Sequence, residues 1–253
     1  MNPVLLLAHN NLALTKRCVE SIRAQDIPTK IYIFDNGSTD GTNEWANSDD
    51  SGDINYTRFT TNKGVSFGWN YILEWLLGHP AIAEHCLCVG TDTILPSWFY
   101  RVLLAYLCES VPFITGVAVD DLAAAMDPTA IPESLSHNPD FSGFLISRQC
   151  WQAVGKFDES MQIYSSDQDY HIRAWRRGVP LYKTGVRFYH EASSTLRLAE
   201  PRDRMEIQMQ ADRDRARLRE KWGVPAGGPE YEALFNSETF GCELEEDHEK
   251  TNA

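Results

Sequence analysis

The sequence predicts an α/β fold in which a mainly parallel, mixed central sheet is flanked by helices. Short apolar runs alternate with segments of helical periodicity through the first half of the chain, and this order favours parallel strands joined by right-handed crossovers. The 253 residues, 43% hydrophobic and 23% charged, are enough to bury a sizeable core. We expect a main domain at 1–222 and a C-terminal extension at 223–253 with an acidic, flexible tail.

The first half opens with an apolar run at 4–8, which predicts a strand, and 11–24 carries apolar residues at helical spacing. A second apolar run, 31–34, predicts the next strand. The cluster NGSTDGT at 36–42 consists of turn and capping residues and predicts a short helix that runs through Trp45. The other elements expected in this half are strands at 54–59 and 86–89 and helices at 68–77 and 98–107.

The second half contains expected strands at 113–119, 141–147 and 185–189. Between the first two of these, 120–139 is rich in Asp, Ala and Pro without periodicity and predicts a long loop over a site. A helix at 166–177 ends at Gly178, as is typical of helix C-termini. Residues 201–222 predict a charged helix with apolar positions at Met205, Met209, Ala216 and Leu218. The acidic run 243–249 then predicts a frayed tail.

The charge and the cysteines narrow the class of protein. A net charge of −13 argues against a protein whose main affinity comes from neutralising nucleic-acid phosphates. The six cysteines form no C-x-x-C pair, and Cys86 and Cys88 share one face of a strand, which is typical of small core residues. No segment approaches the roughly 20 apolar residues of a membrane span, and no secretion signal is visible. We therefore expect a cytoplasmic protein without an integral membrane segment.

Two strand ends carry candidate metal ligands. The run 86–89 stops at Gly90-Thr91-Asp92, and ligands of α/β proteins bind outside the carboxyl ends of strands. A carboxylate there suits a divalent cation that bridges nucleotide phosphates, although Asp92 also fits a simple turn cap. His190 ends the strand at 185–189 in the same way. Its imidazole is a common metal ligand, and its alternative is a polar loop residue.

Polar loops after two earlier strands are candidate nucleotide contacts. Asp35 follows the second strand and fits either a hydrogen bond to a base or ribose, or an Asx turn. Lys63, in Asn62-Lys63-Gly64, fits either a phosphate contact or an ordinary solvated lysine. The chain contains neither the G-x-G-x-x-G dinucleotide pattern nor a P-loop.

A third group of acidic residues precedes and opens the helix at 166–177. Asp167 lies in the first turn, where the helix dipole favours a carboxylate, and fits either a catalytic base or a capping residue. Asp169 is four residues before Arg173 and is expected to pair with it on one helical face. We therefore interpret Asp169 as structural and Asp167 as the candidate base.

In this order the motifs resemble the inverting family 2 glycosyltransferases, which have the Rossmann-like GT-A fold, over most of 1–222. Residues 34–42 resemble the nucleoside-binding turn, 62–70 the N-x-G…N segment, and 90–92 the DXD position. Residues 154–159 with 166–169 and Arg173 resemble the G-x-F-D-E…E-D-x-D…R block, and 221–223 a C-terminal element of some members. Two departures are Gly90 in place of the first DXD acid and Ser166 before the base.

The resemblance implies a role for each motif residue. Asp167 would be the catalytic base, and Asp92 and His190 would hold Mn²⁺ or Mg²⁺. The residues expected to bind the nucleotide-sugar donor are His9, Asp35, Asn62, Lys63, Gly64, Asn70 and Thr91. The implied reaction is metal-dependent transfer of a sugar from a nucleoside diphosphate donor, a UDP-sugar, to an acceptor hydroxyl with inversion.

Two other functions stay open at this stage. A sugar-nucleotide nucleotidyltransferase would need a basic Gly-rich loop after the first strand, where this chain has Ala8-His9-Asn10-Asn11. A non-catalytic nucleotide-sugar-binding protein fits the missing first acid at Gly90. The expected acceptor is a glycan or another hydroxyl-bearing molecule, with a modified DNA base as a further option. The Arg-bearing helix at 201–222 would allow peripheral membrane contact.

Overall fold

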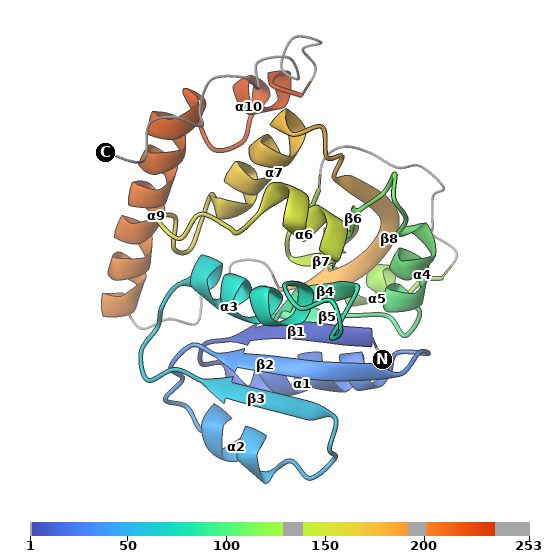
Figure 1. Ribbon diagram of the computed structural model, residues 1–253. Coiled ribbons are helices and arrows are strands. Elements are labelled where there is room, and N and C mark those ends of the chain that lie inside the picture. The colour runs from blue at the N-terminus through green and yellow to red at the C-terminus, as the bar shows by residue number, and fades with distance from the viewer. Residues whose placement is uncertain (1, 129–138, 192–200, 236–253) are drawn as a thin grey trace.

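An eight-stranded mixed sheet forms the centre of the protein (Figure 1). The computed structural model describes residues 2–128, 139–191 and 201–235, and the structural statements below concern these residues. The strands are β1 (Asn2–Ala8), β2 (Thr29–Asp35), β3 (Ile54–Arg58), β4 (His85–Gly90), β5 (Thr93–Ile94), β6 (Phe113–Val119), β7 (Gly143–Ser147) and β8 (Tyr182–His190). Their order in the sheet is β3-β2-β1-β4-β7-β6-β8-β5.

Helices cover both faces of this sheet (Figure 1). They are α1 (Leu12–Arg23), α2 (Thr42–Ser48), α3 (Val65–Leu77), α4 (Phe99–Tyr106), α5 (Leu122–Ala125), α6 (Arg148–Val154), α7 (Ser166–Arg176), α9 (Pro201–Trp222) and α10 (Pro229–Ala233). One core packs α3, α6 and α7 on the sheet through side chains such as Trp69 and Tyr170. The other packs α1 and α4 through Val19 and Phe99. The predicted α/β layering is confirmed.

The strand register brings several loops to one edge of the sheet. β1 pairs in parallel with β2 and β4, and its last residues lie opposite Asp35 and Gly90. β2 pairs in parallel with β3, and β6 with β8. The antiparallel β7 lies between β4 and β6, and the short β5 pairs with the end of β8. The loops after β1, β2, β3 and β4 therefore share one edge, where ligands bind in such sheets.

Several predicted boundaries are wrong by a few residues, and some short elements were missed. α3 begins at Val65 rather than residue 68, directly after Gly64 with its φ of 91°. β8 begins at Tyr182 rather than residue 185. The missed helix α6 is capped by Ser147, whose hydroxyl accepts from the Cys150 N–H at 3.1 Å. Local patterns did not reveal the seven-residue helix α6 or the two-residue strand β5.

The expected long loop at 120–139 is wrong in its first part, because α5 lies there. Asp121 caps this single turn by accepting from the N–H groups of Ala123 and Ala124 at 2.8 and 3.2 Å. An Asp followed by Leu and three Ala residues satisfies the first N–H groups of a helix and then favours continuing it. Residues 129–138, and with them the rest of this predicted loop, lie outside the described residues, as does the acidic tail.

The long helix at 201–222 is confirmed, and of the four apolar positions used to predict it only Leu218 is buried. Met205 and Met209 are 68% and 53% exposed, whereas Ala211, Asp214 and Leu218 are buried. These three positions recur at helical spacing and form the packed stripe. Cys86 and Cys88 are fully buried in the core, as predicted. None of the described helices is both long and apolar enough to cross a membrane.

Candidate active site

The loops after β1 and β2 are joined by hydrogen bonds at the carboxyl edge of the sheet. The Asn10 N–H donates to the Ser38 hydroxyl at 2.8 Å, and the Thr39 N–H donates to the Asn10 side-chain oxygen at 2.8 Å. His9 is exposed beside them. Residues 9–11 and 36–42 therefore form one ordered rim.

Asp35 lies inside this rim and is fully buried. Its carboxylate accepts from the Ser38 N–H at 2.8 Å and from the Tyr56 hydroxyl, and the Arg58 guanidinium lies 3.5 Å away. Burial, the hydrogen bond to Asp35 and its charge raise the pKa of Tyr56, so this phenol stays a donor. Because the carboxylate has no exposed surface, the expected base contact remains a prediction that requires the turn 36–42 to open.

Asn62, Lys63 and Gly64 form the neighbouring part of the edge. The Asn36 amide donates to the Asn62 side-chain oxygen at 2.8 Å and accepts from the Lys63 N–H at 2.7 Å. At Gly64 an added Cβ would lie 2.9 Å from the Gln162 carbonyl oxygen, so only glycine allows this close approach. The Lys63 side chain is exposed here. The structure thus brings the predicted donor-binding loops together.

The side-chain amide of Asn70 is fully hydrogen-bonded inside the protein rather than available at this edge. Its Nδ2 donates to the Phe157 carbonyl and to Glu159 Oε1, both at 2.9 Å, and its Oδ1 accepts from the Phe157 N–H at 2.8 Å. It is 3% exposed. In this geometry Asn70 ties α3 to the chain at 157–159, and its donor contact stays a prediction.

We expect Asn70→Ala to destabilise the fold rather than to weaken donor binding. The change leaves the buried backbone groups of Phe157 without partners, which costs about 1–3 kcal/mol. Denaturant unfolding measures the loss, with the exposed Asn47→Ala as control. An unchanged free energy of unfolding together with a raised KM for the donor would show that Asn70 binds donor directly.

Asp92 and His190 lie side by side, as expected from their positions at two strand ends. The pairing of Thr93 with His190 between β5 and β8 brings the His190 Nε2 within 3.4 Å of the Asp92 Oδ2. Burial lowers the pKa of His190, but the hydrogen bond and charge of Asp92, together with the charge of Asp140, outweigh burial and raise it. The pair therefore holds a carboxylate oxygen and an imidazole nitrogen together at the edge of the sheet.

Gly90 gives Asp92 the space that it occupies. A Cβ at residue 90 would lie 2.8 Å from the Asp92 Oδ1, so the carboxylate folds back over the glycine. Thr91 lies between them and is partly exposed. An acidic residue at position 90 would push Asp92 out of this arrangement. The departure from the DXD pattern is thus coupled to the position of Asp92.

A pocket of about 360 Å³ is lined by Asp167, whereas Asp92 and His190 are not among its lining residues. Ser142, another lining residue, accepts a 3.2 Å hydrogen bond at its carbonyl from the Gly90 N–H. Val65 and Trp69 of α3 form part of the wall. The pocket therefore joins the start of α7 to the end of β4.

Asp167 lies in the first turn of α7, as predicted, and its carboxyl is partly exposed to the pocket. Burial raises its pKa, the N–H groups of Gln168 and Asp167 lower it, and the negative charge of Asp140 raises it; the net shift is upward. A carboxylate with a raised pKa accepts a proton more readily than an ordinary one.

Asp169 is structural, as predicted. It is fully buried and accepts from Arg173 Nε at 2.8 Å and from the Trp222 indole at 2.9 Å, and Lys221 Nζ lies 2.8 Å from it. These contacts use both carboxylate oxygens. The carboxylate of Asp169 is therefore fully used in contacts that hold α7 and α9 together.

Sequence reasoning missed two charged residues of the pocket, Asp140 and Lys183. Asp140 accepts from the N–H groups of Ser142 and Ala118 at 2.9 and 3.3 Å. Its charge acts on both Asp167 and His190, so it lies between the two halves of the site. No local motif marks either residue, because each comes into the pocket through strand pairing.

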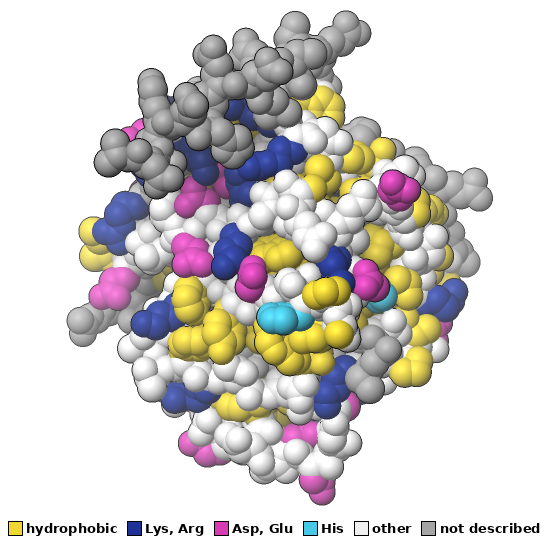
Figure 2. All heavy atoms as spheres, in the orientation of Figure 1, with side chains coloured by type: hydrophobic (Ala, Val, Ile, Leu, Met, Phe, Trp, Pro, Cys, Tyr) yellow, Lys and Arg dark blue, Asp and Glu magenta, His cyan; other side chains and the backbone are white. Residues whose placement is uncertain are grey.

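A second pocket, of about 350 Å³, lies on another side of α3. Its aromatic side chains include Tyr71 and Trp75, which are 47% and 45% exposed. Figure 2 shows hydrophobic side chains gathered over α3 on this face. Of the predicted site residues, Asp167 lines the first pocket and Asn70 the second, and Asp92 and His190 line neither.

Comparison with solved structures shows which fold this is. A mannosyltransferase, PcManGT, from Pyrobaculum calidifontis matches with a TM-score of 0.60 and 14% identity, covering 92% of this chain and 67% of that chain. TarS 1-349 from S. aureus matches at 0.59 and 15%, covering 87% and 73%. Glucosyl-3-phosphoglycerate synthase from Mycobacterium tuberculosis matches at 0.59 and 16%, covering 90% and 82%.

The sequence itself matches one family. Residues 4–119 fit the model described as glycosyl transferase family 2, and no curated protein matches the chain. The matched segment contains β1 to β6, with the rim loops and Asp92. The chain thus matches glycosyl transferase family 2 over residues 4–119 and has the GT-A fold of the solved glycosyltransferases.

Proposed function

We propose that the protein transfers a sugar from a UDP-sugar to an acceptor hydroxyl, with inversion at the anomeric carbon and with a divalent metal ion. The observation that carries the proposal is the place of Asp167. Its carboxyl lines the pocket, and Ser142 of the same pocket accepts a hydrogen bond from Gly90, two residues before Asp92. The candidate base thus lies in a cavity whose wall is bonded to the end of the strand that leads to the candidate metal ligand.

Asp92 and His190 fit a divalent cation. One carboxylate and one imidazole suit Mn²⁺, and a site with few protein ligands also suits Mg²⁺ when phosphates and water complete it. No group of three or more His, Cys, Asp or Glu side chains able to hold a metal occurs among the described residues, so the donor diphosphate would supply further ligands. When bound, the ion would offset charge on the leaving nucleotide.

Residues of the rim and of the two neighbouring loops would bind the donor. His9 and Thr91 border the edge, Lys63 offers an exposed cation for phosphate, and Asp35 orders the turn that would meet the nucleoside. Two neighbours support a nucleotide-sugar donor: the mannosyltransferase was solved with GDP-Man and Mn²⁺, and TarS with UDP. We propose UDP as the nucleotide of this protein.

Asp167 would take the proton of the acceptor hydroxyl as that hydroxyl attacks the anomeric carbon. The other carboxylate of the pocket, Asp140, already accepts two backbone N–H groups, so it is poorly suited to act as a nucleophile. One base and no second free carboxylate favour a single displacement, which inverts the configuration.

The acceptor in this proposal is a glycan or another hydroxyl-bearing molecule. A modified DNA base is a further acceptor class, although the acidic chain gives little attraction to nucleic acid. The exposed Arg residues of α9 would allow peripheral contact with a membrane surface. We propose a cytoplasmic enzyme, since nucleotide sugars and reduced cysteines fit that compartment.

A thermal-shift panel of nucleotide sugars, each with and without Mn²⁺, tests this function. A ligand that binds only the folded state raises the Tm. We expect a UDP-sugar to raise it, and to do so more with Mn²⁺ present. A rise with GDP-sugars alone would replace the proposed nucleotide, and no rise with any nucleotide sugar would contradict the function.

The raised pKa of Asp167 also predicts how stability depends on pH. An acid whose pKa is raised by folding stabilises the protein below its unfolded pKa, near pH 4, and this contribution is lost as pH rises through the folded pKa. At pH 7 the native state therefore carries an unfavourable charge that Asn lacks. We expect Asp167→Asn to raise the Tm at pH 7 and to have little effect below pH ~4.

The measurement is a set of melting curves from pH 3 to 8 for the wild type and Asp167→Asn, with the exposed Asp120→Asn as control. An equal Tm difference at every pH would show that the ionisation of Asp167 is not its cause.

A further inference from the structure

Helix α9 contacts the chain that leads into α7 at several successive turns. Figure 1 shows α9 running beside α7, with the segment between α6 and α7 reaching toward it. Arg217 lies near Ser160, and Lys221 pairs with Asp158. The Asp214 carboxylate accepts a hydrogen bond from the backbone N–H of Ile163. One helix thus sets the path of the segment 158–164, which directly precedes the candidate base.

The central contact is the buried carboxylate of Asp214. It accepts the N–H groups of three consecutive residues, Gln162, Ile163 and Tyr164, at 3.2, 2.8 and 2.9 Å. The Gln210 amide donates to it at 2.7 Å, and the side chain has no exposed surface. A carboxylate accepts all four bonds without presenting a donor of its own, and charged acceptors make the stronger hydrogen bonds.

The turn that Asp214 holds belongs to two walls of the site. Ile163 and Tyr164 line the pocket with Asp167. The Gln162 carbonyl accepts from the Val65 N–H at 2.6 Å, next to Gly64 of the donor-side loop. The chain then passes through Ser165, which has a φ of 66°, before Asp167. The direction in which α7 starts therefore depends on where the turn 162–164 is fixed.

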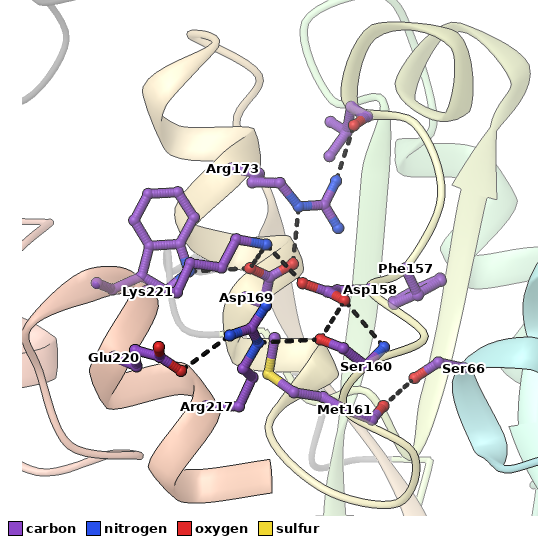
Figure 3. Close-up of polar contacts among 12 residues, drawn as sticks. Ser66, Phe157, Asp158, Ser160, Met161, Asp169, Arg173, Arg217, Glu220 and Lys221 are labelled. Carbon is purple, nitrogen blue, oxygen red and sulfur yellow. Dashed lines mark hydrogen bonds and ion pairs between the residues drawn. The ribbon is translucent and has the colours of Figure 1, made fainter. Parts of the chain in front are cut away.

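The C-terminal part of α9 is held to the segment before α7 and to α7 itself by ion pairs, as Figure 3 shows. Lys221 lies between Asp158 and Asp169, 2.7 and 2.8 Å from their oxygens, while Arg173 approaches Asp169 from its own helix. Burial raises the pKa of Asp158, but the bonds from Lys221 and Ser160 outweigh it and lower the pKa to about 2. α9 is thus anchored on both sides of the turn.

We infer that Asp214 is a positioning residue for Asp167: its carboxylate fixes the turn 162–164 so that the base faces the pocket. The inference rests on the proposed function, since it assigns the chemistry to Asp167. It also gives α9 a supporting role in the active site through this turn.

Asp214→Asn tests the inference with little change of volume. The new amide presents an N–H to backbone N–H groups, so the turn shifts. We expect kcat to fall roughly 10- to 100-fold, since small misplacements of reacting groups have effects of this size. The donor KM should change less than kcat because, of the three residues of the turn, only Gln162 is hydrogen-bonded to the donor-side loop, at Val65. Asp212→Asn, two residues away and 66% exposed, is the matched control and should keep wild-type kcat.

Wild-type kcat in Asp214→Asn would overturn the inference, as would an equal change of kcat and donor KM, or the same loss in Asp212→Asn. If Asp214→Asn does not fold, Gln210→Ala perturbs the same carboxylate more gently. That variant should lower kcat more than it changes the donor KM, and unchanged kcat in it would be equally decisive.

Hydrogen exchange of the 162–164 amides, measured without substrate, separates this inference from the proposed function. Faster exchange in the Asp214 variant than in the Asp212 variant shows that Asp214 holds the turn, even if the wild type transfers no sugar. Equal exchange in both variants would show that it does not.

Discussion

Asp167→Asn is expected to abolish sugar transfer while leaving donor binding intact. The amide cannot accept the proton of the acceptor hydroxyl, and general base catalysis contributes about 10²- to 10⁴-fold to such rates. Because the side chain keeps its size, the pocket and the first turn of α7 should not change. We expect kcat to fall by at least about 100-fold at an unchanged Kd for the donor.

Steady-state kinetics and donor titration on the same preparation measure both quantities, with Asp120→Asn as the control for a change of one carboxylate elsewhere. Near-wild-type turnover in Asp167→Asn would remove Asp167 from the role of base. Asp140 would then be the remaining carboxylate of the pocket to test.

Asp92→Ala is expected to remove most metal-dependent turnover. Asp92 and His190 are the protein's proposed ligands, so removing the carboxylate leaves a single imidazole. Loss of one stabilising group at a developing charge typically lowers kcat by about 10²- to 10³-fold. The variant should also need more Mn²⁺ for half-maximal activity, and the stabilisation by donor plus Mn²⁺ should shrink.

A Mn²⁺ titration of activity and of Tm distinguishes these effects, with Asp50→Ala, an exposed carboxylate outside the site, as control. Full activity of Asp92→Ala at the wild-type Mn²⁺ requirement would show that the metal, if used, binds elsewhere. In that case the closeness of Asp92 to His190 would be only a structural ion pair.

The first half of the fold could be predicted because each strand and helix there has its own local signal. Apolar runs end at polar turn residues, and parallel connection through helices places all these turns at one edge. For the same reason Asp92 and His190 could each be proposed as strand-end ligands. Their contact could not be derived locally, because it depends on the short β5 pairing with β8 across almost a hundred residues.

The residues that sequence reasoning missed lack such local signals. Asp140 and Lys183 reach the pocket through strand pairing, and the antiparallel β7 that brings Asp140 there interrupts the simple parallel pattern. Asp214 is hidden among the many charges of α9. Asp is rarely fully buried unless its carboxylate has partners, so the sequence gives no reason to expect burial at this position. The partners here are backbone N–H groups at least 50 residues away in the sequence.

Product analysis tests the central claim most directly: the protein is incubated with a UDP-sugar, Mn²⁺ and a panel of hydroxyl acceptors, and the released nucleotide is identified. A glycosyltransferase releases UDP, and we expect UDP together with a glycosylated acceptor from the wild type and neither from Asp167→Asn. Cleavage of the donor within its pyrophosphate linkage, in place of UDP release, would contradict the account. Tight donor binding with no product from any acceptor would contradict it as well.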